Sequence, residues 1–315
     1  MAEVIKKATR EAYGEALTAI APEFPNLVVL DADLAAATKT GIFKKKYPER
    51  HIDCGIAEGN MIGVAAGLAA SGNIVFASSF AMFAAGRAFE QIRNSVAYPH
   101  LNVKIGATHA GVSVGEDGAT HQCCEDIALM RAIPGMVILN PADDVETLQA
   151  VRAAAAYNGP VYLRFGRLAV ERIFDESYHF EIGKGAQLTN GSDVTVAATG
   201  LMVGEALAAK KLLAAEGISA RVLDIATIKP LDDALLLRAA AETGAIVTAE
   251  EHNIIGGLGS AVAELVGEHC PVPVVRVGVR DTFGKSGPAK ELLQVFGLDA
   301  AHIVEAAKRA VAMKK

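Results

Sequence analysis

Short apolar runs alternate with helix-like segments along this chain, and that alternation restricts its fold more than any other feature. In the first half, the apolar runs are residues 27–30, 74–77, 103–107, 137–139 and 161–163. Continuous apolar runs of this length are typical of strands covered on both faces in a parallel sheet. The helix-like segments of this half are residues 62–71, 83–97, 124–132 and 145–156. Asp143 is a suitable N-cap for the last of these helices.

The alternation stops over residues 166–192, which are rich in charges, aromatics and glycines, and then begins again. In the second half, the expected strands are residues 194–198, 220–224, 245–249 and 274–277. The expected helices are residues 203–216, 231–242 and 259–269, followed by two more at the end of the chain. We therefore predict an α/β protein with two successive parallel-sheet domains, residues 1–170 and 193–315, joined by a linker of residues 171–192. Ligands should bind at the carboxyl ends of the strands.

Composition limits the partners that this chain can have. Of its 315 residues, 51% are hydrophobic and 21% are charged, which excludes a disordered chain. The net charge of −6 argues against nucleic acid as a partner, because proteins that neutralise phosphates are usually basic. No run approaches the ~20 apolar residues that span a bilayer, and no secretion signal is recognisable. We expect a cytoplasmic protein whose four cysteines are reduced and, lacking a C-x-x-C pair, bind no metal.

The densest group of polar residues follows the expected strand 103–107. Residues 108–122 include His109, His121, Glu116 and Asp117 together with three glycines. Histidine exchanges protons near neutral pH, and glycines allow the tight turns that bring side chains and backbone toward a ligand. A surface loop that only caps the next helix is the structural alternative. The whole cluster favours a binding or catalytic loop.

Two further segments have residue types that suit a site. Glu58 begins a helix that is otherwise mostly Ala, Gly, Val, Ile and Leu, so the carboxylate is either a helix-terminal charge or a functional acid. Phe80 and Phe83 come just after an expected strand in a chain with only 5% aromatic residues. They are either core packing or a surface on which a flat ring stacks.

In this order, these segments resemble the pyrimidine-binding and C-terminal domains of transketolases, over nearly the whole chain. The most specific parts are residues 55–61, Gly-Ile-Ala-Glu-Gly-Asn-Met, and residues 115–122, Gly-Glu-Asp-Gly-Ala-Thr-His-Gln. The other matching positions are Arg10, Asp31, Asp33, Phe80, Phe83, His109 and Arg167. The second domain resembles the family's C-terminal domain, and we expect it to support dimerisation without a catalytic role.

The resemblance implies thiamine diphosphate as the cofactor. Glu58 matches the carboxylate that shares a proton with N1′ of the cofactor's aminopyrimidine ring. Phe83 would stack on this ring, and Phe80 would help to form its pocket. His121 would contact the carbonyl region of the donor sugar, so that Glu58 and His121 are the expected catalytic residues.

The resemblance also implies how a sugar is held. Asp117 would bind the 2-hydroxyl of the donor, and Asp33 would lie near the sugar hydroxyls. Arg10, His109 and Arg167 would hold the sugar phosphate, because the forked donors of a guanidinium suit phosphate oxygens. The implied reaction is the transfer of a two-carbon ketol unit from a ketose phosphate to an aldose phosphate, as in pentose phosphate metabolism.

Two departures from the family pattern affect these expectations. Residues 35–37 are all alanine where the family has a phosphate-binding serine, which leaves open a transketolase for an unusual sugar. The family's Gly-Asp-Gly motif, which helps to hold the Mg²⁺ that bridges the diphosphate, does not occur in the chain. We therefore expect no metal ligand here, and a partner N-terminal subunit that carries the Mg²⁺ site. The chain should self-associate as a dimer, form a heterotetramer with that partner, and be inactive alone.

Three alternatives remain at this point. A deoxyxylulose-phosphate synthase or the β subunit of a keto-acid dehydrogenase would share the domain pair and the glutamate. Thr120, His121 and His109 favour a transketolase over both, because a sugar donor needs several groups that bind hydroxyls. A specialised transketolase for an unusual sugar is the second alternative. The third is a non-catalytic structural partner, which would not require the polar types at Glu58 and Asp117.

Overall fold

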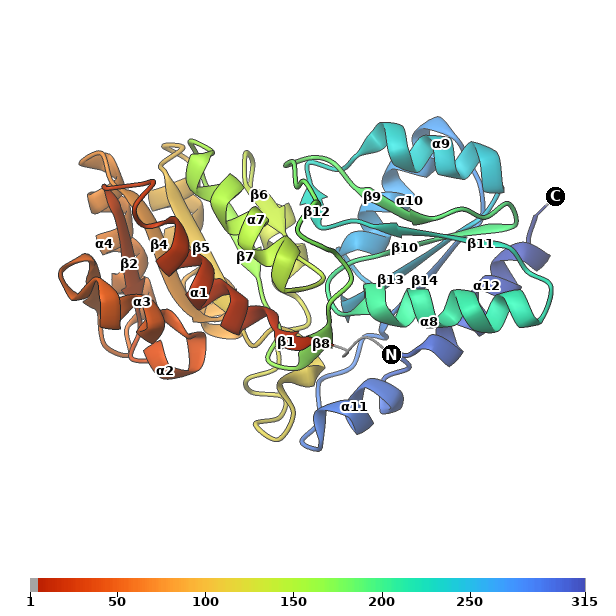
Figure 1. Cartoon of the computed structure of the whole chain (residues 1–315), viewed down its shortest axis with the longest axis horizontal. Coiled ribbons are helices and arrows are strands. Elements are labelled where there is room, and N and C mark those ends of the chain that lie inside the picture. The colour runs from red at the N-terminus through yellow and green to blue at the C-terminus, as the bar shows by residue number, and fades with distance from the viewer. Residues whose placement is uncertain (1–4, 315) are drawn as a thin grey trace.

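A seven-stranded sheet forms the centre of the first lobe, and a five-stranded sheet forms the centre of the second (Figure 1). This computed structural model describes residues 5–314. In spatial order, the first sheet consists of β12 (Thr227–Lys229), β6 (Val137–Leu139), β7 (Val161–Arg164), β5 (Val103–Thr108), β4 (Ile74–Phe80), β2 (Leu27–Asp31) and β3 (His51–Asp53). All neighbouring strands except β12 are parallel, and β4 and β5 are buried along their whole length. The continuous apolar runs therefore predicted the type of sheet correctly.

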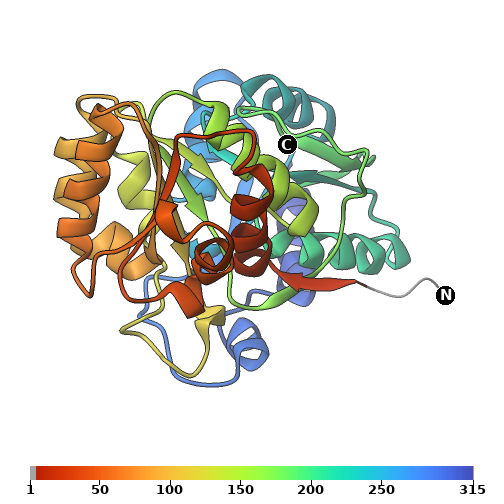
Figure 2. The ribbon, with the colours of Figure 1, turned by 60° about the vertical axis from the view of Figure 1, so that its left-hand side comes forward.

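Helices cover both faces of the first sheet, with α1 on one side and the orange helices around α4 on the other (Figure 2). The elements on the α4 side are α4 (Glu58–Ala70), the π-helical segments η2 (Met82–Arg87) and η3 (Ile92–Ala97), and α6 (Asp126–Arg131). The opposite face is covered by α1 (Thr9–Ile20) and α7 (Asp144–Ala156). The remaining short helices of this lobe are α2 (Ala35–Thr38), α3 (Thr40–Lys46), η1 (Pro48–Arg50), α5 (Phe89–Gln91) and η4 (Val112–Val114). None of the helices within residues 5–314 has the length and apolarity that a membrane crossing needs.

The second sheet repeats the parallel arrangement of the first. In spatial order its strands are β14 (Val274–Val279), β13 (Ile246–Asn253), β10 (Val194–Ala198), β11 (Ala220–Asp224) and β9 (Ala186–Thr189), of which only β9 is antiparallel. Side chains of α8 (Met202–Ala215) and α12 (Ala300–Ala312) pack in one cluster, and those of α9 (Asp233–Thr243) and α10 (Leu258–His269) pack in another. A shorter helix, α11 (Ala289–Val295), precedes α12. The predicted fold class, two successive parallel α/β sheets, is confirmed.

Strand β12 connects the lobes, because it follows β11 of the second lobe in sequence but pairs with β6 of the first. The backbone N–H of Asn140 donates to the carbonyl of Ala226 at 2.8 Å, which continues the pairing beyond β6. The sequence did not predict this strand. Its residues, Thr-Ile-Lys, form no continuous apolar run, and only tertiary contact gives them a partner.

Other differences from the sequence expectation are also local. The segment 83–97, expected as one helix, consists of η2, α5 and η3. The sequence did not predict these breaks, because π-helical turns leave no mark on apolar periodicity. Part of the expected linker is ordered in sheets: β8 (Ala169–Glu171) pairs with β1 (Lys6–Ala8), and β9 pairs with β11. The domain limits 1–170 and 193–315 stay a prediction, and residues 1–4 and 315 of these ranges lie outside the described residues.

Candidate active site

The carboxyl ends of the strands in the first sheet meet at one edge, and most of the predicted site residues follow these ends. Asp33 follows β2, Glu58 follows β3, Phe80 ends β4, His109 follows β5, and Arg167 follows β7. Two of them have a left-handed backbone, with φ of 60° at Asp33 and 57° at His109. Residues other than glycine seldom adopt this conformation, and it concentrates where a ligand site constrains the chain. Backbone strain therefore marks the same edge as the polar motifs.

Glu58 is the first residue of α4, and only 1% of its surface is exposed. Its Oε1 accepts a hydrogen bond from Ser79 Oγ at 3.1 Å, and its Oε2 accepts one from Arg87 Nη1 at 2.6 Å. The amino end of α4 adds the favourable field of the helix dipole. The carboxylate is therefore held at a fixed position, next to a strand end, by a hydroxyl and a cation.

The two phenylalanines lie against the two histidines of the polar loop. The rings of Phe80 and Phe83 have their centroids 5.9 Å apart and are nearly parallel, and the His109 ring stacks on Phe80 at 3.8 Å. His121 approaches the edge of this group, with its ring centroid 5.3 Å from that of Phe83. Segments 80–83, 109 and 121, which are separate in sequence, thus form one cluster of rings. Phe80 is buried, whereas Phe83 and His121 are half-buried and accessible to a ligand.

His109 is buried beside a group of cations. Its Nε2 lies 3.1 Å from Arg10 Nη1, and its Nδ1 lies 2.9 Å from Thr108 Oγ1. Burial, together with the positive charges of Arg10 and Arg167, lowers the pKa of His109 to about 3. A guanidinium can only donate, so the neutral ring accepts at Nε2 and carries its hydrogen on Nδ1. His109 therefore provides a hydrogen-bonding ring rather than a positive charge.

Arg10 and Arg167 supply the positive charge of this edge. Arg10 Nη1 also donates to the carbonyl of Ala37 at 2.9 Å, and burial lowers the pKa of Arg10 from its ordinary value. Arg167 Nη1 donates to the carbonyl of Val114 and to Glu116 Oε2, the latter at 3.1 Å. Both guanidinium groups are only partly buried and are close enough to His109 to affect its charge. They could hold an anion between them.

Within residues 5–314, neither Asp33 nor Asp117 forms a hydrogen bond or ion pair with this cluster. Both are exposed, and the backbone N–H of Asp33 donates to Asp53 Oδ1 at 3.1 Å. Asp117 makes no side-chain hydrogen bond with the residues that the structure describes. Asp31 is buried and accepts from Thr38 Oγ1 at 2.7 Å and from Thr40 Oγ1 at 2.8 Å. Asp31 therefore shapes the turn after β2, whereas Asp33 and Asp117 remain available to a ligand.

Arg87 and Ser79 are members of this site that sequence reasoning missed. Besides pairing with Glu58, the Arg87 guanidinium lies 4.7 Å from the centroid of the Phe83 ring. It therefore contacts both groups that were expected to receive a cofactor ring. The available signal was a cation in an Ala- and Gly-rich stretch four residues after Phe83, but the π-helical turn that sets its direction is not visible in sequence.

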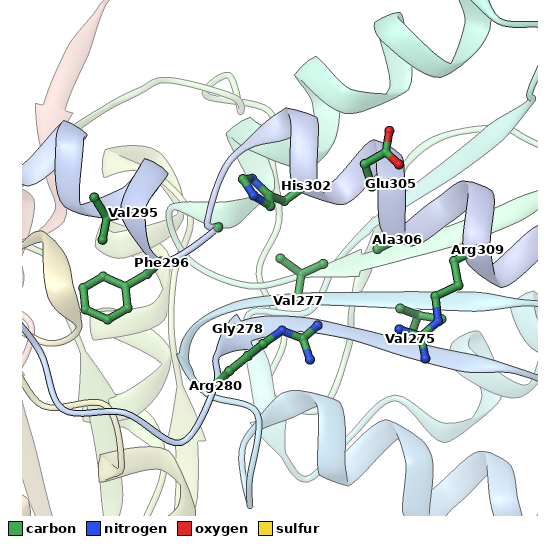
Figure 3. A pocket seen from close by; sticks show the side chains of 11 residues that line it. Val275, Val277, Gly278, Arg280, Val295, Phe296, His302, Glu305, Ala306 and Arg309 are labelled. Atoms are coloured by element: carbon green, nitrogen blue, oxygen red, sulfur yellow. The ribbon is translucent and has the colours of Figure 1, made fainter.

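A separate hollow of about 530 Å³ lies in the second lobe, between β14 and α12 (Figure 3). Arg280 and Arg309 border it together with His302, and it shares no residue with the cluster at the edge of the first sheet. Within residues 5–314, no group of three or more His, Cys, Asp or Glu side chains is arranged to hold a metal ion.

Comparison with known proteins identifies both halves of the chain. Residues 5–172 match the family described as transketolase, pyrimidine binding domain, and residues 183–303 match transketolase, C-terminal domain. A solved structure described as a split gene transketolase, inactive beta4 tetramer, is 54% identical, with a TM-score of 0.92 over 98% of this chain and 99% of that one.

Two curated relatives are described as single subunits of a transketolase. The 6-deoxy-6-sulfo-D-fructose transketolase subunit SqwH of Clostridium sp. (strain MSTE9) is 48% identical over 95% of this chain and 92% of its own length. One subunit of the apulose-4-phosphate transketolase of Phocaeicola vulgatus is 39% identical over 95% of this chain and 96% of its own length. This chain therefore belongs to the transketolase family, whose members use thiamine diphosphate, and it contains that family's pyrimidine-binding and C-terminal domains.

Proposed function

We propose that this chain is the subunit of a two-chain transketolase that binds the pyrimidine ring of the cofactor and the sugar. The reaction is the transfer of a two-carbon ketol unit from a ketose to an aldose. One observation carries the proposal: Arg87 links the buried carboxylate of Glu58 to the Phe80–Phe83 ring pair, and His109, which stacks on Phe80, links the same pair to the guanidinium of Arg10. A ring-binding half and an anion-binding half are thus adjacent.

The residues of the ring-binding half of the site fit the aminopyrimidine ring of thiamine diphosphate. When bound, this cofactor supplies the carbon nucleophile that cleaves and forms carbon–carbon bonds. Glu58 would share a proton with the ring at N1′, and Phe83 would offer the ring a face for stacking. Arg87 now covers that face and pairs with Glu58, so it must turn away from Phe83 when the ring binds. Ser79 would continue to orient the Glu58 carboxylate.

The residues of the anion-binding half of the site fit a sugar with an anionic end. Arg10 and Arg167 would bind the anion, and neutral His109, which accepts a hydrogen bond from Arg10 at Nε2, would orient the Arg10 guanidinium toward it. His121 would contact the carbonyl region of the donor sugar, and exposed Asp117 and Asp33 would contact its hydroxyls. Two relatives have names that specify a sulfonate sugar and a phosphate sugar, which supports an anionic end without selecting its chemistry.

An uncovered apolar surface, formed by α4 and the residues just before it, supports assembly with other chains. Ile56 and Val64 are 77% and 36% exposed, and a Cβ added at Gly63 or Gly67 would meet nothing within 4 Å. An exposed apolar surface of this kind is typical of a place where another chain binds. We propose that the chain self-associates as a dimer and forms a heterotetramer with an N-terminal subunit. We propose the cytoplasm as its location. That subunit would provide the ligands of Mg²⁺, and the chain alone would be inactive.

The test is reconstitution with the N-terminal subunit, thiamine diphosphate and Mg²⁺. We expect ketol transfer from ketoses that carry a phosphate or sulfonate, and none from either subunit alone. Turnover of pyruvate without turnover of ketoses would reject a transketolase in favour of a synthase or a keto-acid dehydrogenase. Activity of the single chain with cofactor and Mg²⁺ would contradict the division of the site between two subunits.

A further inference from the structure

The substrate loop, defined as residues 112–122, carries Asp117 and His121 and lies against the second lobe. In Figures 1 and 2 its yellow trace runs beside the blue segment that leads into α11. The second lobe contacts the loop through Glu251, near the end of β13, and through the turn at residues 284–287. The proposed function uses neither contact.

Glu251 holds the beginning of the substrate loop. This side chain is buried, and its Oε1 accepts a hydrogen bond from the backbone N–H of Ser113 at 2.6 Å. The carboxyl group also fills the space beside Gly111, where a Cβ would lie 2.3 Å from Glu251 Cδ. Gly111 has φ of 79°, so only glycine suits this position both in conformation and in space. The carboxylate is therefore packed directly against the turn that starts the loop.

Gln122 holds the end of the same loop. Its buried Nε2 donates to the carbonyls of Val112 and Gly115, at 3.1 and 3.2 Å, and to the carbonyl of Lys285 in the second lobe at 2.8 Å. In the middle of the loop, a Cβ at Gly118 would lie 2.3 Å from Ser286 Oγ. The loop thus touches the second lobe at both of its ends and near Asp117.

Arg164 holds the backbone of Glu251 in place. Its Nη2 donates to the carbonyl of Glu251 at 2.9 Å, and its Nε donates to Asp126 Oδ2 at 2.8 Å. Both partners of this ion pair are buried, at 4% and 0% side-chain exposure. A buried pair of this kind is costly to disturb, so the carbonyl end of Glu251 has little freedom. The Glu251 carboxylate therefore extends to Ser113 from a backbone that Arg164 holds in place.

We propose that Glu251 is a positioning residue for the substrate loop: from the second lobe, it holds the first turn of the loop and so places His121 and Asp117 for the sugar. This inference rests on the proposed function. Glu250, the preceding residue, is also buried, but its carboxylate accepts from the N–H groups of Leu258 and Gly259, at 2.7 and 2.8 Å, and so caps α10. It is a matched control, since it makes the same kind of bond on the same strand without touching the loop.

Four variants, Glu251→Ala, Glu251→Gln, Glu250→Ala and Glu250→Gln, separate positioning from general stability. Hydrogen exchange of the peptide that spans 112–122 is measured on the purified chain. KM for the donor ketose, kcat and thiamine diphosphate affinity are measured on the two-chain enzyme. We expect Glu251→Ala to speed exchange in the loop and to lower kcat/KM for the donor by up to about 100-fold through KM, with cofactor affinity unchanged. Glu251→Gln keeps an acceptor at Oε1 and should restore most of the loss.

The Glu250 variants should lower thermal stability without changing loop exchange or donor KM. Slow exchange in the loop of Glu251→Ala would overturn the proposal whatever the activity. Equal increases in donor KM for Glu251→Ala and Glu250→Ala would also overturn it, because the cause would then be general loosening. If wild-type enzyme transfers no ketol unit while Glu251→Ala still frees the loop, the hold on the loop stands and the proposed function fails.

Discussion

The two sheets present the same topological edge, yet they use it in opposite ways. At the carboxyl end of the first sheet, Phe83, His121 and Arg167 are half-buried, and Asp117 is exposed. At the carboxyl end of β13 in the second sheet, Glu250, Glu251 and His252 are all buried and bonded to the protein. Polar residues at a strand end therefore indicate a site only where their side chains keep free bonding capacity. In the second lobe, Glu250 uses that capacity to cap α10, and Glu251 uses it to hold the substrate loop of the first lobe.

The largest effect should come from removing the buried carboxylate at the edge of the first sheet. We expect Glu58→Ala to lower kcat of the two-chain enzyme by about 10²- to 10⁴-fold, the usual range for a group that takes part in proton transfer. Glu58→Gln should lose nearly as much, because it preserves the packing but cannot share a proton in the same way. Circular dichroism should show an intact fold. Unchanged turnover in both variants would remove Glu58 from the chemistry.

The interface between the lobes contains a third kind of acid, which should govern stability rather than activity. Burial raises the pKa of Glu146 on α7 to about 7, and burial together with the charge of Glu146 raises the pKa of Asp224 at the end of β11. Between an ordinary glutamate pKa of about 4.5 and 7, the folded state keeps a proton that the unfolded state releases. The free energy of unfolding should therefore fall as pH rises through this window, by an amount on the order of 3 kcal/mol.

Urea unfolding of the chain at pH 5 and at pH 8 measures this effect. Asp224→Asn removes one of the two competing charges, so we expect it to flatten the pH dependence and to stabilise the chain at pH 8. Asp126 is the opposite case: burial raises its pKa, but the nearby positive charges and the hydrogen bonds from Arg164 and Tyr162 together outweigh burial and lower it. A stability that rises from pH 5 to pH 8 and is insensitive to Asp224→Asn would contradict the retention of a proton by Glu146 in the folded state.

The anion-binding half of the first edge can be tested apart from its ring-binding half. We expect Arg10→Ala and Arg167→Ala each to raise KM for a phosphorylated ketose by about 10- to 100-fold, which corresponds to the loss of a hydrogen bond to a charged group. KM for the same ketose without its anionic group should change little. Arg152→Ala is the matched control, since the ion pair of Arg152 with Glu23, at 3.0 Å, lies on the surface. Equal losses with both ketoses would place these arginines outside an anion site.

The smallest expected effect compares equivalent helix caps in the two lobes. Asp143 caps α7 and also accepts hydrogen bonds from the N–H groups of Ile173 and Phe174, at 2.7 and 2.8 Å. Asp299 caps α12 through the N–H of His302 at 2.9 Å and is half-exposed. We expect Asp299→Ala to cost about 1 kcal/mol and Asp143→Ala about twice as much, measured by chemical unfolding. Equal costs would show that the contacts of Asp143 with the linker add nothing.

Much of the architecture could be predicted because it depends on local pattern. The parallel strands were visible as continuous apolar runs, and Asp143 was recognisable as a cap, since both signals lie within a few residues of chain. The order of the motifs around Glu58, Phe83, His109 and His121 was enough to indicate the family. The short strands β12 and β9 were missed, because neither is a continuous apolar run and their partners are distant in sequence.

The class of fold, the family and the set of residues from which a site could be built follow from the order and spacing of residues along the chain. Which of these residues meet depends on how the chain folds: Arg87 pairs with Glu58 across 29 positions, and Glu251 contacts Ser113 across 138. The two kinds of information differ in the distance along the chain over which they act. Backbone periodicity and capping act over one or two turns of chain, whereas burial and hydrogen bonding between distant segments depend on how the two lobes pack.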